Sequence, residues 1–192
     1  MRVSAFQEHL DAALLEISRH LLCRGSTLLY AGHLGATGYT LRLFDLVLGG
    51  KVGPTSTVTA DGTRNVSWYS SRIPGVLEEV LLTLQAGKPL YLCGAFGGAA
   101  ALAVELLQRR VPEEFTWDFH KQAPHAEGMR DLYTRRGLPW LDYPWMAKFF
   151  AETGVAELAK NNHLSEDENR ELFTSRDVPR ILELLLNGLS RI

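Results

Sequence analysis

The sequence has few cysteines and no long uncharged apolar run. Its two cysteines, Cys23 and Cys93, are too few for a disulfide framework or a cysteine-based zinc site, and we expect both to be reduced and buried. The opening residues lack the apolar core of a signal peptide. The uncharged run Pro89–Val104 is shorter than the ~20 residues that span a bilayer. These absences predict a cytoplasmic protein with no membrane partner.

The sequence also lacks a large excess of charge of either sign. It has 20 Lys and Arg residues and 22 Asp and Glu residues, which give a net charge of −2. The broad positive field that drives non-specific nucleic-acid binding is therefore not expected. No two of the six histidines are four residues apart, and His120 and His125 lie near no dense cysteine or carboxylate cluster. We predict no metal site and no resident cofactor.

What the sequence does contain is an alternation of short apolar runs and helical periodicity. A helix is predicted over residues 4–23, a buried strand at Ser26–Ala31 and a second strand at Leu90–Leu92, each strand followed by glycines and a helix. Residues 1–192 are expected to form one domain. We predict an α/β fold: a Rossmann-like three-layer domain with a mostly parallel sheet and a helical C-terminal part beyond Arg110.

Two glycine turns would then lie at the carboxyl ends of the strands, where open α/β sheets bind ligands. The first is GHLGATG at residues 32–38, and the second spans Gly94–Gly98. Both remove side chains where a phosphate could meet backbone N–H groups at a helix start. Glycines that only permit tight packing of helix on strand would give the same pattern. No Gly-Lys-Ser/Thr follows either turn, and the GxGxxG spacing is absent, so a P-loop NTPase and ordinary NAD chemistry are disfavoured.

The C-terminal segment is predicted to form four helices, and two of its polar residues have two interpretations. Lys121–Arg136 is read as one helix, Pro144–Thr153 as a helix capped by Asp142, and Ser165 to Glu168 as a capping box before a helix to Phe173. Asp177 can cap a last helix. Asn169 and Arg170 could fold back to stabilise a glycine turn or grip a phosphate, or they could belong to a solvated helix face.

Three segments resemble SLOG-type domains of the superfamily of lonely guy (LOG) phosphoribohydrolases. Residues 21–47 resemble the strand, glycine loop and Gly-Phe-Thr of such domains, and Gly38-Tyr39-Thr40 fits the last of these. Residues 90–107 look like their Gly-Gly-Phe-Gly-Gly turn and Ala-rich helix. Residues 163–189 resemble their C-terminal signature, Leu-Ser-x-x-Glu-Asn-x-x-Leu-Phe. The resemblance extends to sensor domains of Thoeris and TIR-linked bacterial anti-phage proteins. Such domains usually have a strand before the first helix, for which at most Arg2 to Phe6 remain here, so we expect a domain cut from, or evolved out of, a longer effector.

The sequence departs from the LOG enzymes where they cut their substrate. In their Pro-Gly-Gly-x-Gly-Thr-x-x-Glu motif the glutamate is catalytic, and alignment of the glycines places Ala101 at that position. Glu105 follows one helical turn later, displaced by about 6 Å along the axis. In the first turn, His33 and Leu34 stand where the SLOG pattern has glycine and aspartate. An enzyme is therefore disfavoured, with no catalytic residue assigned and Glu105 as the alternative acid/base.

The resemblance implies a sensor of a nucleotide-derived signal, of the cyclic ADP-ribose or ADP-ribose class, that controls self-association or a fused or associated effector in anti-phage defence. The alternatives are a LOG-like nucleoside-phosphate glycosidase and a ligand-free oligomerisation scaffold. The predicted ligand contacts are Gly32, His33, Leu34, Gly35, Gly38, Tyr39 and Thr40 in the first turn, Gly94, Ala95, Phe96, Gly97 and Gly98 in the second, and Asn169 and Arg170.

Overall fold

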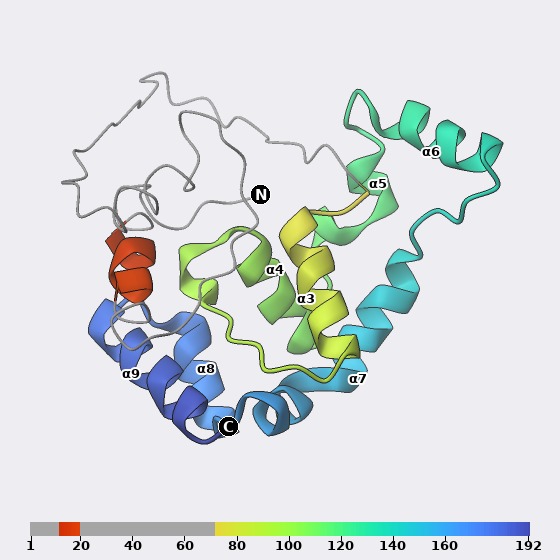
Figure 1. Cartoon of the computed structure of the whole chain (residues 1–192). Coiled ribbons are helices and arrows are strands. Elements are labelled where there is room, and N and C mark those ends of the chain that lie inside the picture. Colours follow the sequence, from red (N-terminus) through yellow and green to blue (C-terminus); the bar gives the residue numbers. More distant parts are fainter. Residues whose placement is uncertain (1–11, 20–71) are drawn as a thin grey trace, which may run out of the picture.

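The computed structural model describes residues 12–19 and 72–192, and all the regular structure in these two ranges is helical (Figure 1). Residues 12–19 form a helix. The further elements are α3 (Gly75–Gln85), η1 (Gly94–Phe96), α4 (Gly98–Leu107), η2 (Glu113–Phe115), α5 (Trp117–His120), α6 (Ala126–Arg135), α7 (Tyr143–Asn162), α8 (Glu166–Thr174) and α9 (Val178–Ser190), where η denotes a 3₁₀ turn.

The prediction of a three-layer α/β domain with a parallel sheet is wrong for this structure, because residues 12–19 and 72–192 contain no strand. The segment predicted as the second strand, Leu90–Leu92, has no regular secondary structure, and no strand lies beside it within the described ranges. Its Leu90 carbonyl instead accepts a hydrogen bond from Asn162 Nδ2 at 2.8 Å. A short apolar run marks a buried segment, and helices can bury it as well as a sheet can. The predicted first strand, Ser26–Ala31, lies outside the described residues.

Several helix boundaries follow the local signals in the sequence. The predicted glycine stop after α3 is Gly87, which has φ +61°. Helix α4 covers the predicted segment and begins one residue earlier, at Gly98. The capping box at α8 is present, with Glu168 N–H donating to Ser165 Oγ at 3.1 Å and Ser165 N–H donating to Glu168 Oε2 at 2.7 Å. These elements confirm the helical interpretation of their sequences.

Two predicted helices have different extents. The helix expected over Lys121–Arg136 is shorter than predicted, because residues 121–125 form turns, where Pro124 cannot continue a helix, and only α6 lies within the predicted range. Helix α7 begins after Asp142, as predicted, but continues beyond Thr153 to Asn162 through a kink at Gly154 (φ 58°, ψ −175°). Glycine tolerates this backbone conformation, so the chain resumes a helix after it.

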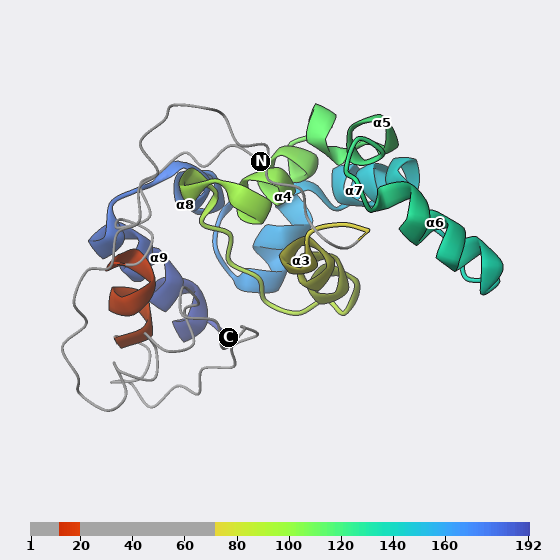
Figure 2. The same ribbon diagram turned by 90° about the horizontal axis from the view of Figure 1, so that it is seen from above.

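Two apolar clusters form the core of the described residues. The first lies where α3, α4 and α7 pack together and includes Leu77, Leu106 and Phe150, whose side chains are almost inaccessible to water. The second lies among α8, α9 and the helix over residues 12–19 (Figure 2). Leu92 belongs to the first cluster and Phe96 to the second, so the chain between them passes from one to the other. The second glycine turn therefore sits at the junction of the two clusters.

Candidate ligand-binding site

The second glycine turn is a short 3₁₀ turn that leads directly into α4. Gly97 N–H donates to the Gly94 carbonyl at 2.9 Å and closes the turn. Gly97 then adopts φ 87°, ψ −155°, and Gly98 adopts φ 66°. A side chain would strain both positions, and the Gly97 conformation is essentially restricted to glycine. The N-cap residue of α4 is Gly97, so among the described residues no side chain supplies a capping oxygen for the first backbone N–H groups of this helix.

Gly94 has a different role within the same turn, because it lies against its neighbours. A Cβ built at Gly94 would approach the Phe173 carbonyl oxygen to 2.8 Å and Val104 Cγ2 to 3.0 Å. Gly94 therefore allows the turn to pack onto the end of α8 and the side of α4. The packing interpretation accounts for this glycine, whereas Gly97 and Gly98 are required by their backbone conformation.

Arg176 reaches the turn from the connection between α8 and α9. Its Nε donates to the Ala95 carbonyl at 3.2 Å, and the residue is exposed. This contact brings a guanidinium group next to the glycine turn. Sequence reasoning missed Arg176, because the 81 residues between the two partners contain no signal that brings them together. The only local sign was a basic residue between the helices α8 and α9.

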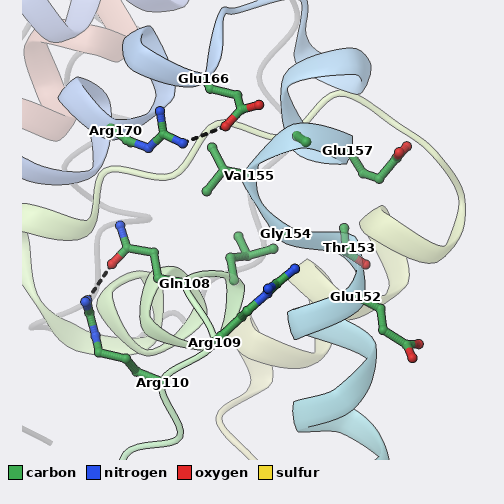
Figure 3. A pocket seen from close by; sticks show the side chains of 12 residues that line it. Gln108, Arg109, Arg110, Glu152, Thr153, Gly154, Val155, Glu157, Glu166 and Arg170 are labelled. Carbon is green, nitrogen blue, oxygen red and sulfur yellow. Dashed lines mark hydrogen bonds and ion pairs between the residues drawn. The ribbon is translucent and has the colours of Figure 1, made fainter.

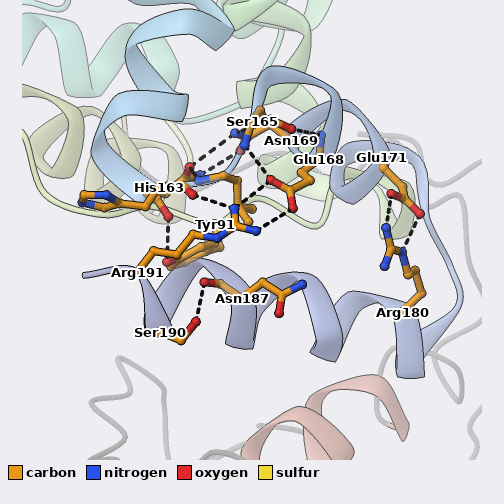
Figure 4. Close-up of polar contacts among 12 residues, drawn as sticks. Tyr91, His163, Ser165, Glu168, Asn169, Glu171, Arg180, Asn187, Ser190 and Arg191 are labelled. Carbon is orange, nitrogen blue, oxygen red and sulfur yellow. Dashed lines mark hydrogen bonds and ion pairs between the residues drawn. The ribbon is translucent and has the colours of Figure 1, made fainter.

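Asn169 is fully buried and belongs to a polar network below the turn (Figure 4). Its Oδ1 accepts from Asn162 Nδ2 at 2.7 Å, and its own amide donates to the Ser165 carbonyl at 3.0 Å. Asn162 is also fully buried and binds the Leu90 carbonyl. The paired amides therefore hold the segment before the glycine turn against α7 and α8. These bonds engage the predicted ligand contact Asn169 in a structural network.

Arg170, the other predicted C-terminal contact, is not brought to the glycine turn. It forms ion pairs with Glu166 at 2.6 Å and Asp167 at 2.8 Å on its own helix. It also lines a groove with the C-terminal residues of α4 (Figure 3). Because α4 has 10 residues, this groove and the glycine turn lie at opposite ends of a helix about 15 Å long.

The pKa values of two side chains, Cys93 just before the turn and Glu168 of α8, indicate structural rather than nucleophilic roles. Burial raises the pKa of the Cys93 thiol to about 11, so it is protonated and unreactive near neutral pH. Hydrogen bonds from Arg191 and the Ser165 N–H lower the pKa of Glu168 to about 2. Arg191 contacts Glu168 Oε2 at 3.0 Å and also the His163 carbonyl at 3.0 Å. This ion pair fixes the chain end against the start of α8 (Figure 4).

Comparison with protein families gives a match over most of the chain. The family model described as SLOG cluster2 matches residues 4–53 and 62–172. The chain belongs to the SLOG cluster2 family. Searches of curated proteins and of solved structures gave no match. The predicted SLOG resemblance is thus confirmed, and the chain is a LOG-like, nucleotide-related domain.

In this SLOG cluster2 domain, α4 carries Ala101 and Glu105, the two positions that distinguish hydrolysis of a nucleotide from binding alone. Ala101, at the place of the LOG glutamate, is partly buried at the end of the first turn of α4, and its N–H donates to the Gly97 carbonyl at 3.3 Å. Glu105 is the one carboxylate of α4 and is partly buried. The first glycine turn, Gly32 to Thr40 with His33, lies outside the described residues, as does the predicted helix after it.

His120 and His125, weighed above as metal ligands, lie near each other in the SLOG cluster2 domain, with ring centroids 6.2 Å apart. His120 Nδ1 is 2.7 Å from the Tyr143 hydroxyl, which donates to the Arg72 carbonyl at 2.9 Å. Burial and the nearby His125 lower the pKa of His120. Within residues 12–19 and 72–192, no three His, Cys, Asp or Glu side chains gather as a metal site would require. In the same ranges, no helix has the length and hydropathy needed to cross a bilayer.

Proposed function

We propose that this SLOG cluster2 domain is a sensor that binds a nucleotide-derived signal of the ADP-ribose or cyclic ADP-ribose class. The observation that carries the proposal is the conformation of the second glycine turn. Gly97 and Gly98 both have positive φ and lead into a helix start that no side chain within residues 12–19 and 72–192 caps. Phosphate oxygens are favoured at such a helix start, where backbone N–H groups and the helix dipole meet them.

Arg176 supplies the second element of the proposed phosphate site. Its bond to the Ala95 carbonyl keeps a positive charge beside the turn. Gly94, Ala95, Phe96, Gly97 and Gly98 would contact the ligand through their backbone, and the first glycine turn would complete the site. Asn169 would act indirectly, by holding the segment that precedes the turn.

The proposed output is a change in self-association or in the activity of a fused or associated effector. The support is the resemblance to sensor domains of Thoeris and TIR-linked anti-phage proteins, together with membership of the SLOG cluster2 family. A role in bacterial anti-phage defence is proposed from the same resemblance, and the cytoplasm is the location that the sequence predicts. A homo-oligomer whose assembly depends on ligand is the simplest form of this coupling.

A glycosidase is the second candidate, because α4 does carry one carboxylate. Glu105 lies one helical turn beyond Ala101 and would have to serve as a displaced acid/base. This candidate predicts release of free base from AMP-type nucleotides by the wild type and none by Glu105→Gln. Binding without base release favours the sensor.

The test is isothermal titration of the full chain with cyclic ADP-ribose isomers, ADP-ribose, NAD and cyclic nucleotides, combined with sedimentation to follow assembly. Gly98→Ala is the site variant, and Gly137→Ala is its matched control. Gly137 follows α6, has φ +63° and has no atom within 4 Å of a built Cβ. Both changes place a side chain in the left-handed region, so both should lower Tm because of backbone strain.

The sensor proposal expects Gly98→Ala to lose ligand binding and Gly137→Ala to retain it. Arg176→Gln should weaken binding by about tenfold or more, the equivalent of one charge-assisted hydrogen bond. Failure of all these ligands to bind the folded wild type would refute the proposal. Equal binding by wild type and Gly98→Ala would leave packing as the role of the turn.

A further inference from the structure

The groove at the far end of α4 is a second polar site, separate from the glycine turn. Its volume is about 510 Å³, within the range of small-molecule sites. Its walls are residues 107–110 at the end of α4, residues 152–157 around the kink of α7, and Glu166 and Arg170 of α8. Figure 3 shows Arg109 extended toward α7 and Arg110 turned toward Gln108.

Arginine occupies a position in this groove where the same chain elsewhere uses glycine. Arg109 has φ 63°, just beyond the end of α4. The corresponding left-handed residues after α3 and α6 are Gly87 (φ 61°) and Gly137 (φ 63°). Glycine adopts this conformation without strain and is the usual residue there. The chain thus places a long cationic side chain at the groove although the backbone favours glycine.

The groove wall holds three arginines and three glutamates, and each of the glutamates is paired with a cation. Glu152 pairs with Lys148 at 3.7 Å, Glu157 with Lys160, and Glu166 with Arg170. Within the described ranges, Arg109 and Arg110 have no carboxylate at ion-pair distance. Arg109 Nε makes a long contact of 3.4 Å with the Ala151 carbonyl, and Arg110 donates to Gln108. Most of their ten guanidinium N–H hydrogens are therefore available to a ligand.

Small residues beside these cations leave room for a ligand. Gly154, Val155 and Ala156 form the wall contributed by the kink of α7. Arginine binds phosphate oxygens through two parallel hydrogen bonds, and its affinity for phosphate exceeds its affinity for neutral acceptors. We infer that the groove between α4 and the kink of α7 is a second binding site, for a small phosphorylated molecule whose phosphate groups are held by Arg109 and Arg110.

The test uses inorganic pyrophosphate as the probe, titrated into the full chain at fixed salt. Arg109→Gly and Arg110→Gln should each weaken binding by about tenfold or more. Arg136→Gln, which removes an exposed charge beyond α6, is the control and should bind as the wild type does. Gly98→Ala should retain the binding that depends on Arg109 and Arg110, because it alters only the glycine turn.

Arg109→Gly separates a ligand-binding role from a structural one. If Arg109 serves only to brace the Ala151 carbonyl, the glycine variant should melt earlier and bind pyrophosphate normally. The binding role predicts the reverse, with Tm at or above that of the wild type because the left-handed backbone strain is relieved. Binding that Gly98→Ala abolishes, binding that both arginine variants retain, or no saturable binding by the wild type would each overturn the inference. Failure here leaves the sensor proposal standing, because that proposal is tested by other ligands and by changes at the turn.

Discussion

Gly188→Ala tests the packing of α9 against the segment before the glycine turn. Gly188 lies inside α9, where alanine is ordinarily more stable than glycine by about 0.5–1 kcal/mol. A Cβ at this position, however, would come within 2.6 Å of both Cε1 and the hydroxyl oxygen of Tyr91. It would also come within 2.8 Å of the Asn162 carbonyl oxygen. The steric conflict should therefore outweigh the helix preference.

The size of the stability loss depends on which neighbouring group has to shift to make room for the new Cβ. The Asn162 carbonyl is backbone, so the Tyr91 ring is the group that can shift. Its hydroxyl donates to that same carbonyl at 3.0 Å, and the loss of this bond costs about 1 kcal/mol. Overpacking of a filled site costs typically about 1–3 kcal/mol. After the helix gain is subtracted, we expect a loss of about 1–3 kcal/mol and a Tm lower by roughly 2–12 °C.

Urea and thermal unfolding followed by far-UV circular dichroism measure the effect. Gly128→Ala is the matched control, because Gly128 is inside α6 and has no atom within 4 Å of a built Cβ. That variant should gain about 0.5–1 kcal/mol. Tyr91→Ala combined with Gly188→Ala should cost less than the sum of the single changes, because the clash with the ring is removed. If Gly188→Ala stabilises the protein as Gly128→Ala does, the close packing described here is incorrect.

Two further predictions concern a helix cap and an ion pair. Asp142 accepts from the Trp145 N–H at 2.9 Å, whereas Asp177 makes no side-chain cap bond, so Asp142→Ala should cost about 1 kcal/mol in urea unfolding and Asp177→Ala clearly less. Equal losses would contradict this difference. The pKa of Glu168 is lowered from 4.5 to about 2, so its carboxylate stabilises the fold above pH 4.5, and this contribution disappears as the pH falls from 4.5 to 2. Glu168→Gln should therefore be less stable than the wild type at pH 7 and nearly equal to it at pH 2, and a stability difference that does not depend on pH would refute this linkage.

The sequence was sufficient to predict features that depend on contacts between residues close together in the chain. The capping box at Ser165 and the start of α7 after Asp142 involve residues three apart, so each could be found without tertiary information. The left-handed glycine after α3 belongs to the same group. Sequence similarity also placed the chain in its family, and the match covers both predicted glycine turns.

Features that depend on distant contacts were not predicted. Leu90–Leu92 has the apolar character of a buried strand, but its carbonyl partner is Asn162, which lies 72 residues away from Leu90. Arg176 beside Ala95 is a comparable case. The kink at Gly154 could not be predicted either. A glycine inside a helical pattern is compatible with a helix end or with a kink, and only tertiary packing decides between them. The pairing of Asn162 with Asn169 is also set by tertiary structure, although both side chains are polar and look solvated in the sequence.

The Asn162 and Asn169 pair has a consequence for how the molecule opens. One amide side chain, that of Asn162, bonds to the Leu90 carbonyl, to Asn169 and to the Leu164 N–H. The segment at Leu90, the end of α7 and the start of α8 therefore lose a partner together if any one of them separates. Because an unpaired buried amide is costly, these segments should exchange their protected amide hydrogens with solvent as a single cooperative unit. The glycine turn is attached to this unit, so its shape should persist for as long as the unit stays closed.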